Sequence, residues 1–441
     1  MKSLRVDRNS VISFMLIAPS TAFYYKHQLE ELQQALIEQG HKVVLVLYDI
    51  DTTLVSQIIQ KNSIDVVLQV NALRNRFLDL PQNVIFISWF QDIFPGDESF
   101  IDENIADDNF IITLGDPEIL GFRKRPKKFL GTFYSGVSDR NLSIYSPQNK
   151  YIYEGSLCGF IPNFTKKIRN SNLTYNTIQK IPYPLSTICK TLVNGSPLDQ
   201  SYFFNTMRSI TDMNYTPLSG DLSMNKIETA IRSHLNFYDN FKFTSWYETK
   251  FIMPSRTPGF HGIMNIERFL KERALFFFAQ TYPRYADRTK LFDLIEQFNP
   301  NFKVFGSNWN KYESFVNNWG GVIQTKGALW DLYKNSKVNY SNNTHGLGLH
   351  SRVLECMASG GLVAMHQSKR DHLDGGILSS FQEEEHFLFY DNLSFMDLVN
   401  NKAFHHKITK NAFEIVKEKH TWSCSAKHLV SMVNNKFQSN L

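Results

Sequence analysis

Residues 337–365 read KVNYSNNTHGLGLHSRVLECMASGGLVAM and contain two apolar runs separated by a turn and a helical segment. Residues 350–359 carry apolar side chains at helical spacing, so they predict a helix. Gly360 and Gly361 are expected to end it, because glycine adopts the left-handed backbone that a helix end needs. Residues 362–365 then predict a second buried strand. The whole stretch predicts one unit of a parallel α/β sheet.

The turn of this unit is expected to bind an anion. Gly346 and Gly348 lie in it, directly before the helix. Backbone N–H groups and the positive end of the helix dipole both point at such a turn. Arg352 and Glu355 follow in the first turns, where we expect them to reach a phosphate and a ribose hydroxyl. An arginine at a helix N-terminus is unfavourable by itself, which favours a phosphate partner.

Strands and helices alternate through the first part of the chain. The pattern predicts strands and helices, in chain order, at residues 11–18, 26–39, 41–48, 52–61, 64–70, 84–89 and 110–114. Alternation at this spacing predicts a parallel, doubly wound sheet, with ligands outside the carboxyl ends of its strands.

The alternation stops and then returns. Prolines punctuate residues 163–268, which predict a mostly helical insertion. Strands are expected again at 274–280 and 302–305, with a helix at 289–298. The predicted fold class is therefore α/β, with two Rossmann-like domains and a mostly helical insertion. The predicted domains are residues 1–145, residues 146–420 with the insertion at about 163–268, and a terminal helix at 421–441 that crosses back to the first domain.

Composition narrows the class of protein. The chain has 441 residues, 42% of them hydrophobic and 20% charged, which is typical of a globular protein. The net charge of +5 is scattered, so we expect no nucleic-acid partner, whereas contact with a membrane surface stays open. The 4 cysteines lack metal-site spacing. No signal peptide and no apolar window of ~20 residues is seen, so we expect a cytoplasmic protein, with contact at the inner face of the membrane left open.

Short motifs in the second half form an ordered set. They are Arg284 and Arg288 in a loop before a helix, VFGSNW at 304–309, Ser336 and Lys337 followed by residues 340–342, the pattern R-x-x-E-x-x-A-x-G from Arg352 to Gly360, and HTW at 420–422. Together they resemble the "group 1" glycosyltransferases, in particular the branch that includes the spore-maturation protein CgeB.

This resemblance implies a GT-B fold and an enzyme of glycan biosynthesis. The implied donor is a nucleotide-diphosphate-sugar, with UDP-sugar as the expected form, bound by the second domain in the cleft between the domains. The implied reaction is metal-independent transfer of a hexosyl or hexosaminyl group to a hydroxyl of a glycan, a lipid-linked saccharide or a protein. No separate cofactor and no metal is implied.

The resemblance also assigns residues to the donor. Glu355 matches the family glutamate that binds the ribose, and Arg288 fits the arginine that stabilises the leaving diphosphate better than Arg284 does. His345 and His350 are either ligand donors or hydrogen-bonded loop histidines, and Ser351 is expected to cap the helix. The expected donor-binding residues are Arg284, Arg288, Gly306, Asn342, His345, Gly346, Gly348, His350, Ser351, Arg352 and Glu355.

One departure from the family pattern leaves the mechanism open. Many retaining members carry a second acid eight residues before the glutamate, where this chain has Leu347. An inverting enzyme needs a general base, for which Asp92 in WFQDIFP is the candidate, although a turn aspartate is an equal interpretation. The alternative functions are a nucleotide-sugar 2-epimerase of the same fold and a non-catalytic nucleotide-sugar-binding protein.

Overall fold

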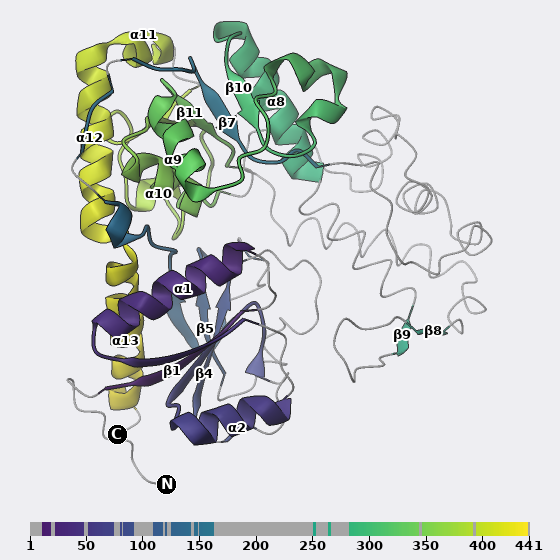
Figure 1. Cartoon of the computed structure of the whole chain (residues 1–441), viewed down its shortest axis with the longest axis vertical. Coiled ribbons are helices and arrows are strands. Elements are labelled where there is room, and N and C mark those ends of the chain that lie inside the picture. The colour runs from purple at the N-terminus through teal and green to yellow at the C-terminus, as the bar shows by residue number, and fades with distance from the viewer. Residues whose placement is uncertain are drawn as a thin grey trace.

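Two parallel β-sheets organise the chain, one in the lower and one in the upper half of Figure 1. The computed structural model describes residues 11–18, 23–47, 52–74, 80–81, 83–91, 109–117, 120, 125–142, 145–148, 150–162, 250–252, 263–265, 282–343, 346–390 and 394–439.

The first sheet has six parallel strands in the order β2-β1-β3-β4-β5-β6. Its elements are β1 (Ser13–Ile17), α1 (Phe23–Glu38), β2 (Lys42–Val46), α2 (Thr52–Asn62), β3 (Val66–Val70), β4 (Ile85–Phe90), β5 (Asn109–Thr113) and β6 (Phe129–Thr132). The five strands predicted here are present; three have shorter bounds, and β4 and β5 are shifted by one residue. The strand β6 was not predicted, because its four residues FLGT are only half-buried and give no apolar run.

Both faces of this sheet are covered, which explains its continuous apolar strands. Phe14 and Leu16 of β1 pack with helix α1, whereas Met15 and Ile17 pack on the opposite face with helix α2. Successive side chains of a strand point to opposite faces, so a strand between two helical layers needs apolar residues at every position. All five residues of β1 are buried.

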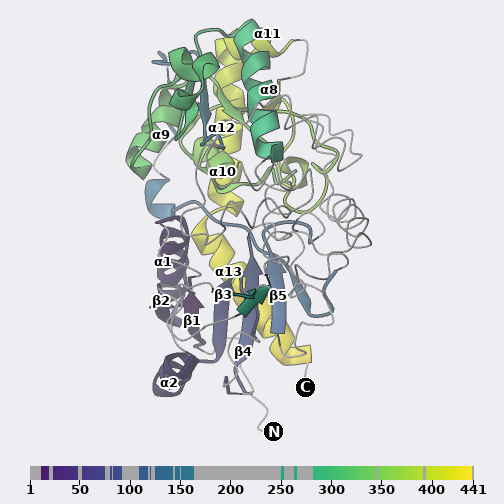
Figure 2. The same cartoon turned by 90° about the vertical axis from the view of Figure 1, so that its right-hand side faces the viewer.

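The second sheet has five parallel strands in the order β10-β7-β11-β12-β13. Its strands are β7 (Ser156–Cys158), β10 (Lys303–Phe305), β11 (Asn339–Ser341), β12 (Val363–Met365) and β13 (Leu388–Phe389). Its helices, best separated in Figure 2, are α8 (Tyr282–Phe298), α9 (Lys326–Asn335), α10 (Ser351–Ala358), α11 (Phe395–Asn400) and α12 (Lys402–Lys419).

The two sheets share one topology. If the strands of each sheet are renumbered from 1 in chain order, both sheets have the strand order 2-1-3-4-5. The first sheet has a sixth strand, β6, at its edge. This is a doubly wound order, with the ligand crevice expected at the carboxyl ends of the strands. The predicted fold class, α/β with two Rossmann-like domains in series, is confirmed.

Two local predictions in the second half differ from the structure. Arg284 and Arg288 were expected in a loop before a helix at 289–298, but α8 already begins at Tyr282 and contains both. Pro283 explains the error, because proline suggests a loop yet is tolerated in the first turn of a helix. The strand β7 was missed because it is only three residues long. The predicted strand at 274–280 lies outside the described residues.

The last helix, α13 (Trp422–Ser439), packs into the core of the first domain. Trp422, Leu429 and Val433 join the same buried cluster as the residues of β1 and α1. The backbone of Val137 accepts from Trp422 N–H at 3.0 Å and donates to the His420 carbonyl at 2.8 Å, which anchors the junction between α12 and α13. Figure 1 shows α12 beside the second domain and α13 beside the first.

Two further findings concern the predicted insertion and the membrane. Within about 163–268, the structure describes only an antiparallel pair of strands, β8 (Lys250–Ile252) and β9 (Ile263–Asn265), so the helical insertion lies outside the described residues. Among the residues that the structure describes, no helix is both long and apolar enough to span a membrane.

Candidate active site

A cavity of about 170 Å³ lies where the carboxyl ends of the two sheets face each other. The first domain contributes Tyr24, Gln91 and Leu114, which follow β1, β4 and β5, respectively. The second domain contributes the other lining residues, among them Cys158 at the end of β7 and Ser341 at the end of β11. Among the described residues that line the cavity there is no Asp or Glu.

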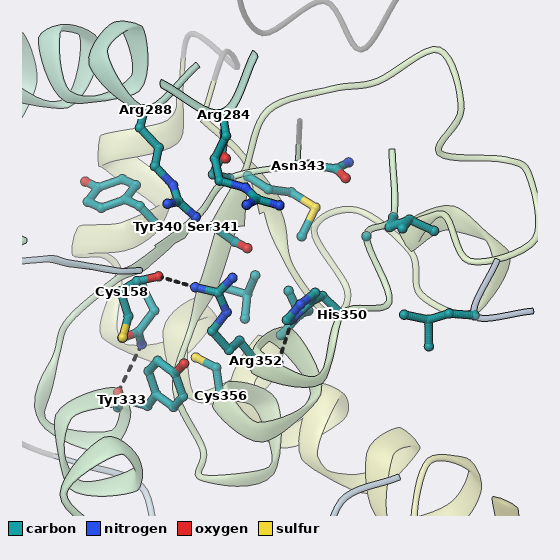
Figure 3. A pocket seen from close by; sticks show the side chains of 18 of the residues that line it. Cys158, Arg284, Arg288, Tyr333, Tyr340, Ser341, Asn343, His350, Arg352 and Cys356 are labelled. Atoms are coloured by element: carbon teal, nitrogen blue, oxygen red, sulfur yellow. Dashed lines mark hydrogen bonds between the residues drawn. The ribbon is translucent and has the colours of Figure 1, made fainter. Parts of the chain in front are cut away.

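Three arginines enter this cavity from the second domain. Arg284 and Arg288 extend from α8, and Arg352 extends from α10, with their guanidinium groups directed toward one another (Figure 3). Arg352 Nη1 donates to the Cys158 carbonyl at 2.9 Å. A Cβ atom on Gly159 would lie 2.8 Å from Arg352 Nη1 and 3.0 Å from Arg288 Nη2. Glycine at this position therefore lets two guanidinium groups approach the same backbone.

Arg288 is the most buried of the three. Its side chain is only 4% exposed, and within the described part of the chain its Nη1 has no hydrogen-bond partner. Its guanidinium carbon lies 5.0 Å from the centre of the Phe160 ring. Burial lowers its pKa, and the neighbouring Arg284 and Arg352 lower it further. Arginine nevertheless stays protonated in proteins, so this wall concentrates positive charge and suits an anion.

His350 caps the helix that carries Arg352. Its Nδ1 accepts the Arg352 N–H at 3.2 Å, and its backbone is extended, as an N-cap requires. The prediction that Ser351 caps α10 is therefore wrong, because Ser351 is the first residue inside the helix. Burial, followed by the charges of Arg352, Arg284 and Arg288, lowers the pKa of His350 to about 3. The ring is neutral at physiological pH and lines the cavity.

The predicted glycine turn packs tightly against a loop of its own domain. A Cβ on Gly346, whose φ is +76°, would lie 2.7 Å from Arg370 Cβ. A Cβ on Gly348 would lie 2.6 Å from the backbone nitrogen of Ile377. Only Gly348 of the two lines the cavity. Both glycines therefore allow close packing, and Gly348 also leaves the backbone open to a ligand.

Leu347, eight residues before Glu355, is part of the contact between the domains. A Cβ on Gly115 of the first domain would collide with the Leu347 side chain. Close by, Asp116 N–H donates to the Asp374 carbonyl at 2.7 Å. An apolar side chain fits this position, because a carboxylate pressed against backbone from the other domain would lose its water.

Glu355 lies near the cavity without lining it. Its Oε1 is 3.2 Å from the Lys326 ammonium at the start of α9, and its side chain is 11% exposed. His27 of α1 is close enough for both charges to affect its pKa, although burial is the largest cause of the lowering. In the described structure, Glu355 therefore belongs to a charged cluster between α1, α9 and α10.

The remaining predicted site residues differ in position. Asn342 lines the cavity, and its neighbour Asn343 does so while donating to Asp371 Oδ1 at 3.0 Å. Gly306, with φ +137°, does not line it; a Cβ there would collide with the backbone of Gly159 and Phe160. Asp92 and His345 lie outside the described residues.

Sequence reasoning missed several lining residues. Cys158 belongs to the short strand β7, and Tyr333 lies near the end of α9. Tyr340 belongs to the motif at 340–342 but was not proposed as a site residue. Gln91 could have been found, since it directly follows β4 at the end of the sheet where ligands are expected. Its neighbour Asp92 was proposed from the sequence instead, because a carboxylate suggests acid–base chemistry.

No group of three or more His, Cys, Asp and Glu side chains with metal-site geometry occurs among the described residues. The fold and the cavity point to an anionic ligand. No curated protein matches the chain significantly.

Solved structures are similar to the chain at low identity. A glycosyltransferase from Rickettsia africae ESF-5 has 10% identity and a TM-score of 0.46, with 98% of this chain and 100% of that chain covered. Anabaena Alr3699/HepE in complex with UDP and glucose has 9% identity and a TM-score of 0.44, with coverages of 96% and 99%. Its complex with UDP-glucose has 11% identity and a TM-score of 0.40, with coverages of 97% and 100%. At these scores the likeness assigns no function.

A family model gives the more specific result. Residues 288–431 match the family described as "Glycosyl transferase-like". The match begins at Arg288 and includes the glycine turn, α10 and the HTW motif, but it spans less than half of the chain. The similarity to this family is thus confined to residues 288–431 of the chain.

Proposed function

We propose that the chain is a metal-independent glycosyltransferase of the GT-B type that uses a UDP-sugar. It moves a hexosyl or hexosaminyl group to a hydroxyl of a glycan, a lipid-linked saccharide or a protein. One observation carries the proposal: three arginines converge on a cavity between two Rossmann-like domains, and no carboxylate is among the described residues of its wall. The match of residues 288–431 to a glycosyl transferase-like family supports the same reaction class.

The arginines would bind the diphosphate of the donor. Guanidinium groups form paired hydrogen bonds to phosphate oxygens, and Arg288 Nη1 is buried with no partner among the described residues. As the bond between the sugar and the diphosphate breaks, negative charge grows on the leaving phosphate. Arg284, Arg288 and Arg352 would stabilise that charge.

Other residues would position the nucleotide and the acceptor. Glu355 would bind the ribose hydroxyls, which requires it to exchange part of its contact with Lys326, now 3.2 Å away, for the ligand. The backbone at Gly348 and the neutral ring of His350 would contact the donor from the start of α10. Asp92 is proposed as the general base that takes the acceptor's proton.

The domain organisation belongs to the same proposal. We assign residues 1–145 to acceptor binding and 146–420 to donor binding, with 421–441 returning to the first domain. Membership of the CgeB-like branch is part of this proposal. The match at 288–431 begins in the assigned donor domain and continues into the terminal helix.

Donor binding and donor hydrolysis test the proposal. A ligand raises the melting temperature of the state it binds, so UDP and UDP-glucose should stabilise the protein more than UMP or inorganic phosphate does. Incubation with UDP-sugars should release UDP and free sugar slowly when no acceptor is present. Absence of stabilisation by every nucleoside diphosphate contradicts the proposal, and binding without turnover under any acceptor favours a non-catalytic binding protein.

A further inference from the structure

Gln91 is a buried amide of the cavity wall, and its functional groups have no partner among the described residues. Its side chain is 6% exposed and lines the cavity from the first domain. Neither Oε1 nor Nε2 has a hydrogen-bond partner among the residues that the structure describes. A buried amide without a partner destabilises a folded protein, so such a group in a cavity points to a ligand that completes its hydrogen bonds.

The backbone at Gln91 is firmly held, in contrast to its side-chain amide. Its N–H donates to Asn71 Oδ1 at 2.9 Å, and Asn71 Nδ2 in turn donates to the Tyr25 hydroxyl at 3.3 Å. Asn71 N–H donates to the Trp89 carbonyl at 2.9 Å, which ties the ends of β3 and β4 together. The backbone of Gln91 is therefore fixed by its neighbours at the wall of the cavity.

Another buried glutamine of the same domain shows the contrast. Gln28 of α1 is 5% exposed, and its Nε2 donates to Ser135 Oγ at 2.6 Å. Gln28 does not line the cavity. Gln28 Oε1 has no partner among the described residues, but its Nε2 has one, whereas both amide atoms of Gln91 lack a partner within the described chain.

We infer that Gln91 recognises a pair of neighbouring hydroxyls of the sugar bound in the cavity, an inference that rests on the proposed function. An amide offers a donor and an acceptor side by side, which matches one hydroxyl that accepts and a second that donates. The amide is neutral, so it has no advantage for a diphosphate. Arg284, Arg288 and Arg352 on the second domain would bind the diphosphate. The sugar attached to the diphosphate would then contact the uncharged side chains of the first domain, which include Gln91.

Such a contact determines specificity more than affinity. A site built to hydrogen-bond a hydroxyl strongly rejects an analogue that lacks it, because its own polar group is then left buried and unpaired. Among the described residues, the first domain also contributes Tyr24 and Leu114 to the cavity, one with a hydroxyl and one with an apolar side chain. Gln91 is thus the amide of this wall that can distinguish sugars differing at neighbouring hydroxyls.

The test compares Gln91→Met with the wild-type full-length protein. Methionine is close in size but cannot hydrogen-bond in this way. The Kd values for UDP, UDP-glucose and UDP-galactose are measured by calorimetry, and Gln28→Met serves as a control for loss of a buried amide away from the cavity. We expect Gln91→Met to keep the UDP affinity within about twofold, to bind the preferred UDP-sugar about tenfold more weakly, and to discriminate less between the two sugars. Gln28→Met should keep the discrimination.

Each outcome has one meaning. If wild type does not bind UDP, the proposed function fails, and the inference about Gln91 fails with it. If UDP binds but Gln91→Met leaves UDP-sugar affinity, sugar discrimination and acceptor use unchanged, the inference is overturned while the proposed function stands. Equal weakening of UDP and UDP-sugar binding also overturns the inference about Gln91. Unchanged UDP-sugar affinity with a raised KM for a sugar acceptor supports hydroxyl recognition and assigns the hydroxyls to the acceptor. Gln91→Leu repeats each measurement if Gln91→Met does not fold.

Discussion

The two sheets share a strand order but differ in what stands at their carboxyl ends. Both run 2-1-3-4-5, and both direct these ends toward one cavity. The second domain places Arg284, Arg288 and Arg352 there, whereas the first places Tyr24, Gln91 and Leu114 there. Topology therefore decides where a ligand can bind. The side chains after each strand decide which part of the ligand each domain contacts.

The domains also differ in how they hold their binding residues. Strands of the first sheet are four to six residues long, whereas those of the second have only two or three. In the second domain, loops are held by close backbone approaches, such as Gly306 against Gly159. Trp309 Nε1 also donates to the Gly159 carbonyl at 2.6 Å. Short strands followed by glycine contacts bring guanidinium groups close to backbone, which longer side chains in the loop would prevent.

Removing the buried arginine should have the largest effect. Arg288→Met removes a guanidinium from the charged wall, and each charge-assisted hydrogen bond contributes about 1.5–3 kcal/mol. We expect the Kd for UDP to rise about 100-fold, measured by calorimetry. Arg125→Met is the matched control, since Arg125 also lies over an aromatic ring, 4.6 Å from the centre of Phe129, but does not line the cavity. Equal losses in both variants contradict the assignment of the diphosphate to this wall.

Acid should destabilise the protein through the buried histidines of the second domain. Burial lowers the pKa of His366, which is 3% exposed, from 6.5 to about 4. Below pH 6.5 the unfolded chain takes up the proton and the folded one does not, so stability is lost as the pH falls toward 4. Between pH 7.5 and 5 this residue alone should lower the free energy of unfolding by about 2 kcal/mol.

Urea denaturation of wild type and His366→Gln at both pH values measures this effect. The variant should lose less stability between the two pH values than wild type does. An equal loss in the two proteins assigns the acid sensitivity to other groups, such as His350, whose pKa is lowered to about 3.

Glu355 gives a test that separates nucleoside from diphosphate. If it binds the ribose, Glu355→Gln should weaken UDP about tenfold, or about 1.4 kcal/mol, and leave pyrophosphate unaffected. Lys326→Gln is the control for loss of the ion pair, which spans 3.2 Å. Isothermal titration with both ligands decides between the outcomes. A loss for pyrophosphate as well, or a matching loss in Lys326→Gln, would show that Glu355 acts through the structure of α10.

The contact between the domains should give the smallest effect. Leu347 is half-buried against Gly115 and Gly375, so Leu347→Ala should lower the free energy of unfolding by about 1 kcal/mol, less than a fully buried leucine. Leu373, 38% exposed on the facing loop, is the control, and Leu373→Ala should change stability by less. Chemical denaturation measures both. Similar values in the two variants would mean that Leu347 contributes no packing between the domains.

Periodic elements of the fold were predictable, and short ones were not. The apolar run at 11–18 and the helical spacing at 350–359 predicted β1 and α10, because burial on both faces or on one face leaves a clear pattern. The three residues of β7 are too few for any pattern. The start of α8 was placed too late because proline, here Pro283, is common both in loops and in the first turn of a helix.

The candidate site was predictable only in part for a similar reason. Arg284, Arg288 and Arg352 could be proposed because arginines near a glycine turn suggest a phosphate. His350 as the cap of α10 was missed, because histidine is not among the usual cap residues. The pairing of Glu355 with Lys326 joins residues of different helices, which no local pattern reports.

The sequence by itself determined the α/β class, the two parallel sheets and the residue types suited to an anionic ligand, since these follow from local periodicity and side-chain chemistry. Only the tertiary structure decided that Leu347 packs at a contact between the domains, that Gly159 lets Arg288 and Arg352 approach the same backbone, and that Gln91 lines the cavity. These features depend on contacts between distant segments. The turn at 346–348, from which the anion site was predicted, therefore turned out to serve packing as much as binding.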